Sequence, residues 1–197
     1  MRSPIIIVLA LAAAAPVAHA DPFVELAGGV MFPVSNNDWT NAVDVSPKFA
    51  ARGGVTRGDL EGLLSLDWTP AQAKADPLFT DISYNRFRIL AAVQLRHLFA
   101  PHIRLSARAG FGIDIAHAGY TVDIPLVGTT SGSDTDTGFA FEPAIGIWYA
   151  LGTTELGLEL ALPIATHSQE GNAQNGDFRF HYTSVDIDLL ATVRFGT

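Results

Sequence analysis

The sequence predicts an all-β protein, an eight-stranded antiparallel transmembrane β-barrel built as an up-and-down meander. Three observations carry this prediction. Apolar and polar residues alternate with period two along eight segments, as they do in strands that have one apolar and one polar face. Short turns and long polar connections alternate between these segments. The apolar faces together hold more side chains than the interior of so narrow a barrel can accommodate.

The predicted strands differ in how clearly they alternate. The first two are rich in Gly and Ala, and a few charged residues, such as Glu25 and Arg52, mark their polar faces. The third to fifth alternate more regularly, and the last is the clearest, with Asp186 and Asp188 between apolar neighbours. Pro143 conflicts with the sixth, because proline cannot donate to a β-ladder. The eight predicted strands span residues 24–32, 49–55, 60–68, 86–96, 103–115, 139–149, 156–164 and 184–195.

The connections predict which strand ends lie on the same side of the membrane. Three of them are tight and are built from turn-forming residues. Because the strand number is even, these turns and both termini fall at one end, and the long connections fall at the other. Bacterial outer-membrane barrels have this arrangement, with the short turns in the periplasm. The predicted short turns are 57–59, 100–102 and 151–153, and the predicted long loops are 34–46, 70–82, 117–138 and 166–178.

A soluble lipocalin-like barrel is the main structural alternative, because its strands also alternate, with the apolar face turned inward. The number of apolar side chains argues against it, since an eight-stranded barrel has room inside for little more than one set of side chains. We therefore expect the apolar face to point outward into lipid. Aromatic residues at its ends fit the interfacial girdles of membrane barrels. They are Trp68, Phe99, Tyr149 and Phe195.

The first twenty residues predict a secretory signal peptide. Met1 and Arg2 give a short basic start, residues 5–15 are apolar, and Ala18-His19-Ala20 is a small-x-small cleavage site. The apolar run is too short to span a bilayer. We therefore expect a signal peptide over residues 1–20 and an outer-membrane β-barrel domain over residues 21–197.

Composition excludes several classes of function. The net charge of −8 disfavours a nucleic-acid partner held through phosphate contacts. With no cysteine, the chain has no disulfide, thiolate metal site, thiol nucleophile or lipidated cysteine anchor. No apolar run in the body of the chain is long enough for a membrane-spanning helix. The sequence predicts no cofactor and no metal site.

The signal peptide, the eight amphipathic segments, the alternation of short and long connections and Phe195 near the C-terminus resemble the small outer-membrane barrels of the OmpA membrane domain, OmpX and OmpW type. The resemblance covers residues 21–197. Members of this class commonly end on the aromatic residue, whereas here Gly196 and Thr197 follow it. The resemblance implies a monomer in the bacterial outer membrane, in contact with outer-membrane lipid and folded by the barrel-assembly machinery.

The polar faces of the predicted strands carry nearly balanced charge. We expect these side chains to be paired inside the barrel, because an isolated buried ion is costly. The side chains nearest mid-height are expected to form a structural charge network, and they are Arg52, Arg108, Glu142, Glu159 and Asp188. The alternative is a gated solute pathway. The full inward set is Lys48, Arg52, Arg86, Arg88, Arg96, Arg104, Arg108 and Arg194 with Glu25, Glu61, Asp67, Asp114, Glu142, Glu155, Glu159, Asp186 and Asp188.

The predicted long loops are strongly acidic, and Lys74 is their one Lys or Arg residue. An acidic rim of this kind repels polyanions unless divalent cations bridge them. Asp134 and Asp136 lie in a Ser- and Thr-rich stretch with oxygen atoms at alternate positions, which is a weak signal for Ca²⁺. The stretch lacks the distal Glu of a calcium loop, so the sequence favours a flexible polar loop.

Some eight-stranded barrels are lipid-modifying enzymes, and lipid A deacylases place His and Ser two apart on one outward strand face. This chain offers His181 with Ser184 and His167 with Ser168, and in both pairs the two side chains fall on opposite faces. We therefore expect a non-enzymatic protein that acts through its acidic surface loops or through envelope integrity. The alternatives are a narrow channel for small or hydrophobic solutes and, third, a lipid-modifying enzyme.

Overall fold

The computed structural model describes residues 20–35, 43–72, 74, 81–124, 128–173 and 176–196. The predicted signal peptide lies outside them, apart from Ala20. No helix in this part of the chain is long and apolar enough to cross a membrane. The strands are β1 (Asp21–Pro33), β2 (Ser46–Arg57), β3 (Leu60–Gln72), β4 (Asp81–Ala100), β5 (Ile103–Ile124), β6 (Gly128–Leu151), β7 (Thr154–Ala161), β8 (Ile164–Ala173) and β9 (Gly176–Phe195).

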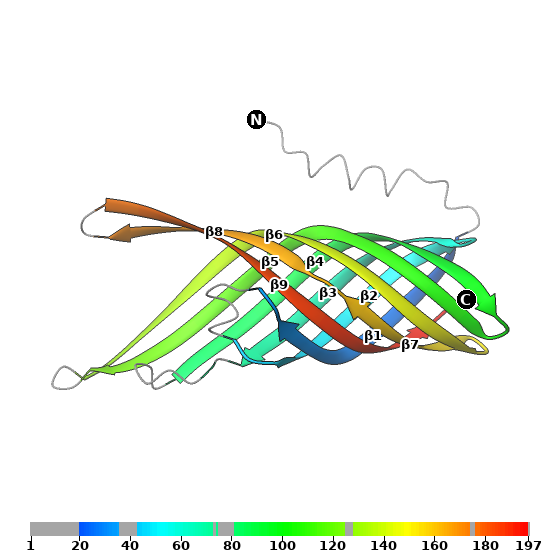
Figure 1. The fold of residues 1–197 in the computed structure, drawn as a ribbon, viewed down its shortest axis with the longest axis horizontal. Helices are drawn as coiled ribbons and strands as arrows, with labels where there is room; N and C mark the ends of the chain where they lie inside the picture. Colours follow the sequence, from blue (N-terminus) through cyan, green and yellow to red (C-terminus); the bar gives the residue numbers. More distant parts are fainter. Residues whose placement is uncertain are drawn as a thin grey trace, which may run out of the picture.

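The strands form one antiparallel sheet that closes on itself (Figure 1). Each strand from β1 to β6 pairs with the next along the chain, and β9 returns to pair with β1. Segments β7 and β8 together occupy one position in the ring, because both lie between β6 and β9. The predicted eight-stranded antiparallel meander is therefore confirmed, with its seventh strand divided in two.

The interruption of the seventh strand explains how Pro143 is tolerated. Leu162 and Pro163 separate β7 from β8, at the level where Pro143 lies on β6. The Leu162 amide donates to the Pro143 carbonyl at 2.9 Å, so the missing N–H of this proline faces the interruption and leaves β5 unaffected. Pro143 therefore removes only one hydrogen bond from the sheet, at a place where the neighbouring strand is already interrupted.

The short turns lie at one end of the barrel, together with the C-terminus (Figure 1). All three occur at the predicted positions, between β2 and β3, β4 and β5, and β6 and β7. Each turn contains one residue in the left-handed backbone region. These residues are Gly58 at φ 62°, His102 at φ 69° and Gly152 at φ 67°. Glycine adopts this conformation without steric cost, and histidine is among the non-glycine residues enriched there.

Two of the predicted long loops are instead largely strand. Residues 117–124 continue β5 and residues 128–138 belong to β6, paired from Asp123↔Thr129 to His117↔Thr135 and beyond. Residues 166–173 and 176–178 likewise continue β8 and β9. The prediction of a flexible loop around Asp134 and Asp136 is therefore wrong, because both residues lie on β6. Threonine is abundant in residues 129–137 and favours strands, but this arm of the hairpin has no apolar face, so its sequence shows no alternating hydrophobicity.

The apolar face points outward and the charged face inward, as predicted. Leu64, Leu66 and Ile145 are 58%, 59% and 63% exposed, although each is strongly apolar. Arg52, by contrast, is 2% exposed inside the barrel. An apolar exterior of this extent is stable only in lipid. The aromatic rings of Phe49, Trp68 and Phe87 stack in a row across β2, β3 and β4 on this outer surface, towards the end opposite the short turns.

Candidate functional site: the charge network in the lumen

The middle of the lumen holds the strongest ion pairs of the predicted network. The Arg52 guanidinium donates to both carboxylate oxygens of Glu159, at 3.1 and 2.7 Å. Arg108 donates to Glu142 at 2.7 Å and to Glu159 at 2.9 and 2.8 Å. These residues come from β2, β5, β6 and β7, so the network ties strands across the barrel. Paired donors in this fixed geometry are typical of strong arginine–carboxylate interactions.

Lys48 connects Asp188 to this network. Its ammonium lies 2.9 Å from Asp67 and 3.3 Å from Glu142, and it also bonds Asp188. All five residues predicted for the network thus belong to it, Arg108 through Glu142 and Glu159, and Asp188 through the lysine. Lys48 was among the inward residues but was not placed at mid-height by the sequence. Its position on β2, four residues from Arg52 and on the same face, is the signal that assigns it to the network.

A second layer of ion pairs lies towards the outer end of the lumen. Arg86 binds Asp114 at 2.7 Å and Asp186 at 2.6 Å, and it donates to the Ser184 hydroxyl at 2.6 Å. Arg88 binds Asp114 at 2.9 Å and Glu142 at 3.0 Å. Because Glu142 also binds Lys48 and Arg108, Arg88 joins this outer layer to the middle of the lumen.

A third layer of ion pairs lies near the short turns. Arg194 binds Glu61 at 2.8 Å and Glu25 at 3.2 Å. Arg96 binds Glu155 at 2.5 Å. The charges in all three layers are almost completely buried, with the exception of Arg104 at the rim, whose side chain is 43% exposed. Pairing is essential here, since each unpaired ion in a low-dielectric interior costs several kcal/mol.

Two aromatic side chains also fill the lumen near the short turns. Trp148 is 1% exposed and donates from its indole nitrogen to Ser106 Oγ at 2.8 Å, and the Arg96 guanidinium lies 4.8 Å from its ring centroid. The Phe23 ring is buried under Arg194 at 3.7 Å. Placing each guanidinium over an aromatic face adds cation–π attraction to the ion pairs. The lumen residues predicted from the sequence were all charged and included neither of these rings.

No protein-family model and no curated protein matches this chain. Solved structures of outer-membrane proteins do match. Neisserial surface protein A is 14% identical, with a TM-score of 0.58 over 88% of this chain and 96% of that one. A major outer membrane protein from Thermus thermophilus is 11% identical, with a TM-score of 0.59 over 90% and 99%. Ail, the attachment invasion locus protein of Yersinia pestis, in complex with the heparin analogue sucrose octasulfate, is 11% identical, with a TM-score of 0.55 over 90% and 99%.

The fold is that of the small outer-membrane β-barrels. The similarity covers nearly the whole of each known chain, so the likeness extends to the complete barrel. This confirms the architectural resemblance seen in the sequence. At 11–14% identity the comparison establishes the fold alone, and what each of these proteins binds is a property of that protein.

The glycines around Trp148 indicate that the space for its ring is built into the barrel. Gly157 pairs directly with Trp148 across β6 and β7, and a Cβ atom at Gly157 would lie 2.5 Å from the indole. Gly157→Ala should therefore displace the ring and destabilise the protein by ~1–3 kcal/mol, the usual cost of overpacking. Urea denaturation in detergent micelles measures this loss.

Gly62→Ala is the matched control for that substitution. Gly62 is also a strand glycine, but a Cβ atom there would meet nothing within 4 Å. We expect no loss of stability, because the substitution only restricts the unfolded chain. Equal losses in the two variants would show that glycine itself, rather than room for the indole, matters at Gly157.

The residues of the weak calcium signal have other surroundings in the structure. Asp134 accepts a hydrogen bond from the Thr135 amide at 2.9 Å. Asp136 lies at the outer end of the lumen, with a carboxylate oxygen 3.3 Å from Nδ1 of the buried His167. Within the described ranges, no three His, Asp or Glu side chains gather closely enough to hold a metal ion.

One member of each histidine–serine pair considered for catalysis, Ser184 and His167, is buried inside the barrel. Ser184 is fully buried and its hydroxyl accepts a hydrogen bond from Arg86. His167 points inward, with Nε2 3.7 Å from Asp114. The side chains of Ser168 and His181 lie outside the described residues. The expectation of a non-enzymatic protein thus remains a prediction.

Proposed function

We propose that the protein is an integral protein of the bacterial outer membrane, with a closed lumen and no enzymatic activity. In this proposal the barrel serves as a monomeric anchor that holds acidic connections and two long hairpins at the outer surface and contributes to envelope integrity. The observation that carries it is the continuous filling of the lumen by three layers of ion pairs and two aromatic rings.

The orientation follows from the same proposal. The short turns face the periplasm, as is usual in barrels of this class, and β5, β6, β8 and β9 extend from the other end (Figure 1). The two hairpins diverge beyond the barrel, since β6 and β8 pair over three residues alone, from Phe139↔Thr166 to Phe141↔Ile164. Backbone surface on both hairpins is thereby presented outside the membrane.

A planar-bilayer recording tests the closed lumen. The purified protein should insert without producing steady single-channel currents in salt solution, because the charged side chains of the lumen bind one another rather than permeating ions. Insertion is checked separately by the different gel mobilities of boiled and unboiled samples, since closed barrels resist detergent. Steady conductance from correctly folded protein would contradict the proposal.

A narrow channel is the second candidate, and one observation favours it. Several buried polar atoms at different heights in the lumen have no hydrogen-bond partner among the described residues, and they include Gln94 Oε1, Asp188 Oδ1 and Thr192 Oγ1. Buried polar atoms of this kind are usually satisfied by water. A wetted lumen would conduct small ions if its water molecules formed a connected file, and the same recording distinguishes the two candidates.

A further inference from the structure

A shallow groove of about 350 Å³ lies on the membrane-facing side of the barrel, near the short turns. Its walls are Leu95 on β4 and Leu105 on β5, and Ala107 forms its floor. Leu95 pairs directly with Ala107 across the two strands, so a large side chain stands opposite a small one. This difference in size creates the depression. Because the surrounding exterior is apolar, the groove takes an apolar occupant.

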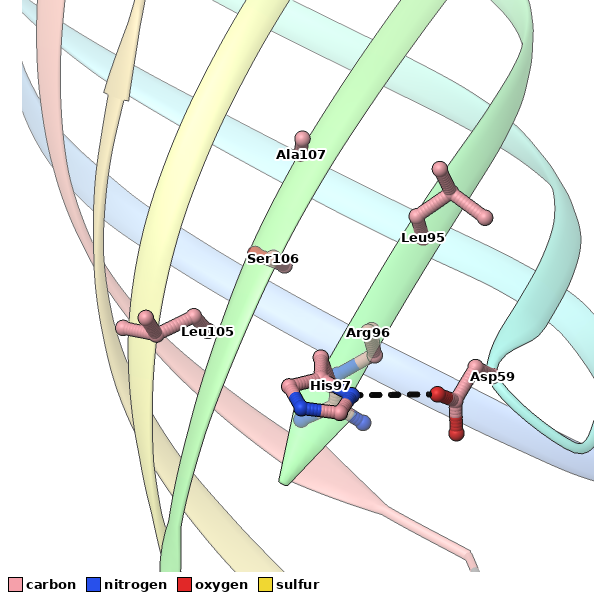
Figure 2. A pocket seen from close by; sticks show the side chains of 7 residues that line it. All are labelled: Asp59, Leu95, Arg96, His97, Leu105, Ser106 and Ala107. Atoms are coloured by element: carbon pink, nitrogen blue, oxygen red, sulfur yellow. Dashed lines mark hydrogen bonds and ion pairs between the residues drawn. The ribbon is translucent and has the colours of Figure 1, made fainter. Parts of the chain in front are cut away.

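A polar pair closes the end of the groove nearest the periplasm. Figure 2 shows the His97 imidazole directed towards the Asp59 carboxylate, which lies in the turn between β2 and β3. His97 Nδ1 is 3.3 Å from Asp59 Oδ2, and the two side chains are 77% and 71% exposed. The Arg96 amide donates to the Asp59 carbonyl at 2.8 Å and fixes this turn against β4. The pair is thus positioned by the fold and open to the surroundings.

The depth of this pair matches the headgroup region of a bilayer. His97 pairs with Leu105, which in turn pairs with Ile147, one outward-facing position from Tyr149 at the barrel end. Interfacial tyrosines of membrane barrels lie at headgroup level. A histidine and an aspartate on an otherwise apolar exterior therefore lie where lipid headgroups begin, while the leucine-walled groove extends towards the acyl chains.

We propose that this groove binds one phosphatidylethanolamine molecule of the periplasmic leaflet. One acyl chain lies over Ala107 between the two leucines. The primary ammonium of the headgroup donates to Asp59 and to Nδ1 of His97, and the lipid phosphate accepts from the N–H at Nε2 of the same imidazole. A headgroup that carries both a primary amine and a phosphate matches the Asp59 carboxylate and the imidazole N–H, whereas an anionic headgroup without an amine offers Asp59 no donor. The proposal rests on the membrane location proposed above.

Native mass spectrometry of the folded barrel tests it, with lipids of identical acyl chains and three headgroups. Phosphatidylethanolamine should be retained about fivefold more than phosphatidylglycerol, which lacks the amine, or phosphatidylcholine, whose quaternary ammonium has no N–H donor. Asp59→Asn should abolish this preference. Equal retention of the three lipids by the parent protein would overturn the proposal.

A second pair of variants tests the groove itself. Ala107→Leu fills the floor and should lower the retention of phosphatidylethanolamine. Ala191→Leu is the matched control, because Ala191 is another exposed strand alanine that lies outside the groove. Equal retention by both variants would contradict the groove as the binding site. The boiled and unboiled gel mobilities and the bilayer recording report folding and closure independently, so a failed lipid preference leaves the proposed anchor role standing.

Discussion

Arg108→Ala should lower the free energy of unfolding by ~3–5 kcal/mol, the usual loss when one partner of a buried ion pair is removed. Arg108 is 5% exposed and donates to both Glu142 and Glu159. Its removal leaves two carboxylates short of a cation in a low-dielectric interior. Arg52 still binds Glu159, and Lys48 and Arg88 still bind Glu142. These remaining pairs, and any water that enters, reduce the loss of stability towards the lower end of that range.

The measurement is the urea midpoint of the barrel in detergent micelles, with Arg104→Ala as the control. Arg104 lies four residues away on β5, but its side chain is 43% exposed, and its one ion pair among the described residues is with Glu155, at 3.3 Å. Arg104 is open to solvent, and Glu155 keeps its pair with Arg96, so the control should lose ~0–1 kcal/mol and unfold almost as the parent does. Adding Glu159→Gln to Arg108→Ala should recover part of the loss, since one fewer charge is then left without its partner.

These variants also separate a closed lumen from an open one. In a closed lumen, Arg108→Ala lowers stability and can introduce a small conductance as water fills the vacated space. In a gated pathway, the parent already conducts, and the substitution alters ion selectivity while stability barely changes. An unchanged midpoint combined with conductance in the parent would overturn the closed lumen and the anchor role that depends on it.

The membrane-embedded half of the fold was predictable because lipid and lumen impose opposite demands on neighbouring residues. Leu158 must face lipid and Glu159 must face the lumen, so the period of two is nearly unbroken there. The tight turns were predictable for a different reason, because Gly58 and Gly152 occupy the left-handed backbone region that favours glycine. Both signals are local, and both appear directly in the sequence.

The outer hairpins and the pairing inside the lumen were not predictable in the same way. Both faces of a hairpin outside the membrane meet water, so residues such as Ser131 and Thr135 carry no alternation. Alternation assigns Lys48 and Asp188 to the lumen, but their contact spans β2 and β9 and depends on how the barrel closes. Phe23, Leu90 and Leu190 are apolar exceptions on the inner face, and Arg194 over the Phe23 ring explains why that ring is tolerated.

Leu160→Arg should destabilise the barrel by ~2–4 kcal/mol and impair its assembly in the membrane. Leu160 is 46% exposed on the outer surface, and its neighbours across β6 and β9 are Ile145 and Leu189, both exposed and apolar. It lies midway along the apolar face of its strand, where an arginine must either lose its hydration or distort the bilayer to keep it.

The control for Leu160→Arg is Leu151→Arg, which tests the dependence on depth. Leu151 is as exposed, at 52%, but it lies at the end of β6 beside the turn, where an arginine side chain reaches the interface. The cost there should fall to ~0–1 kcal/mol. Reversible unfolding into urea from phosphocholine vesicles measures both. If the two arginines cost the same, lipid does not surround Leu160, and the outward face would have to meet water or a protein partner instead.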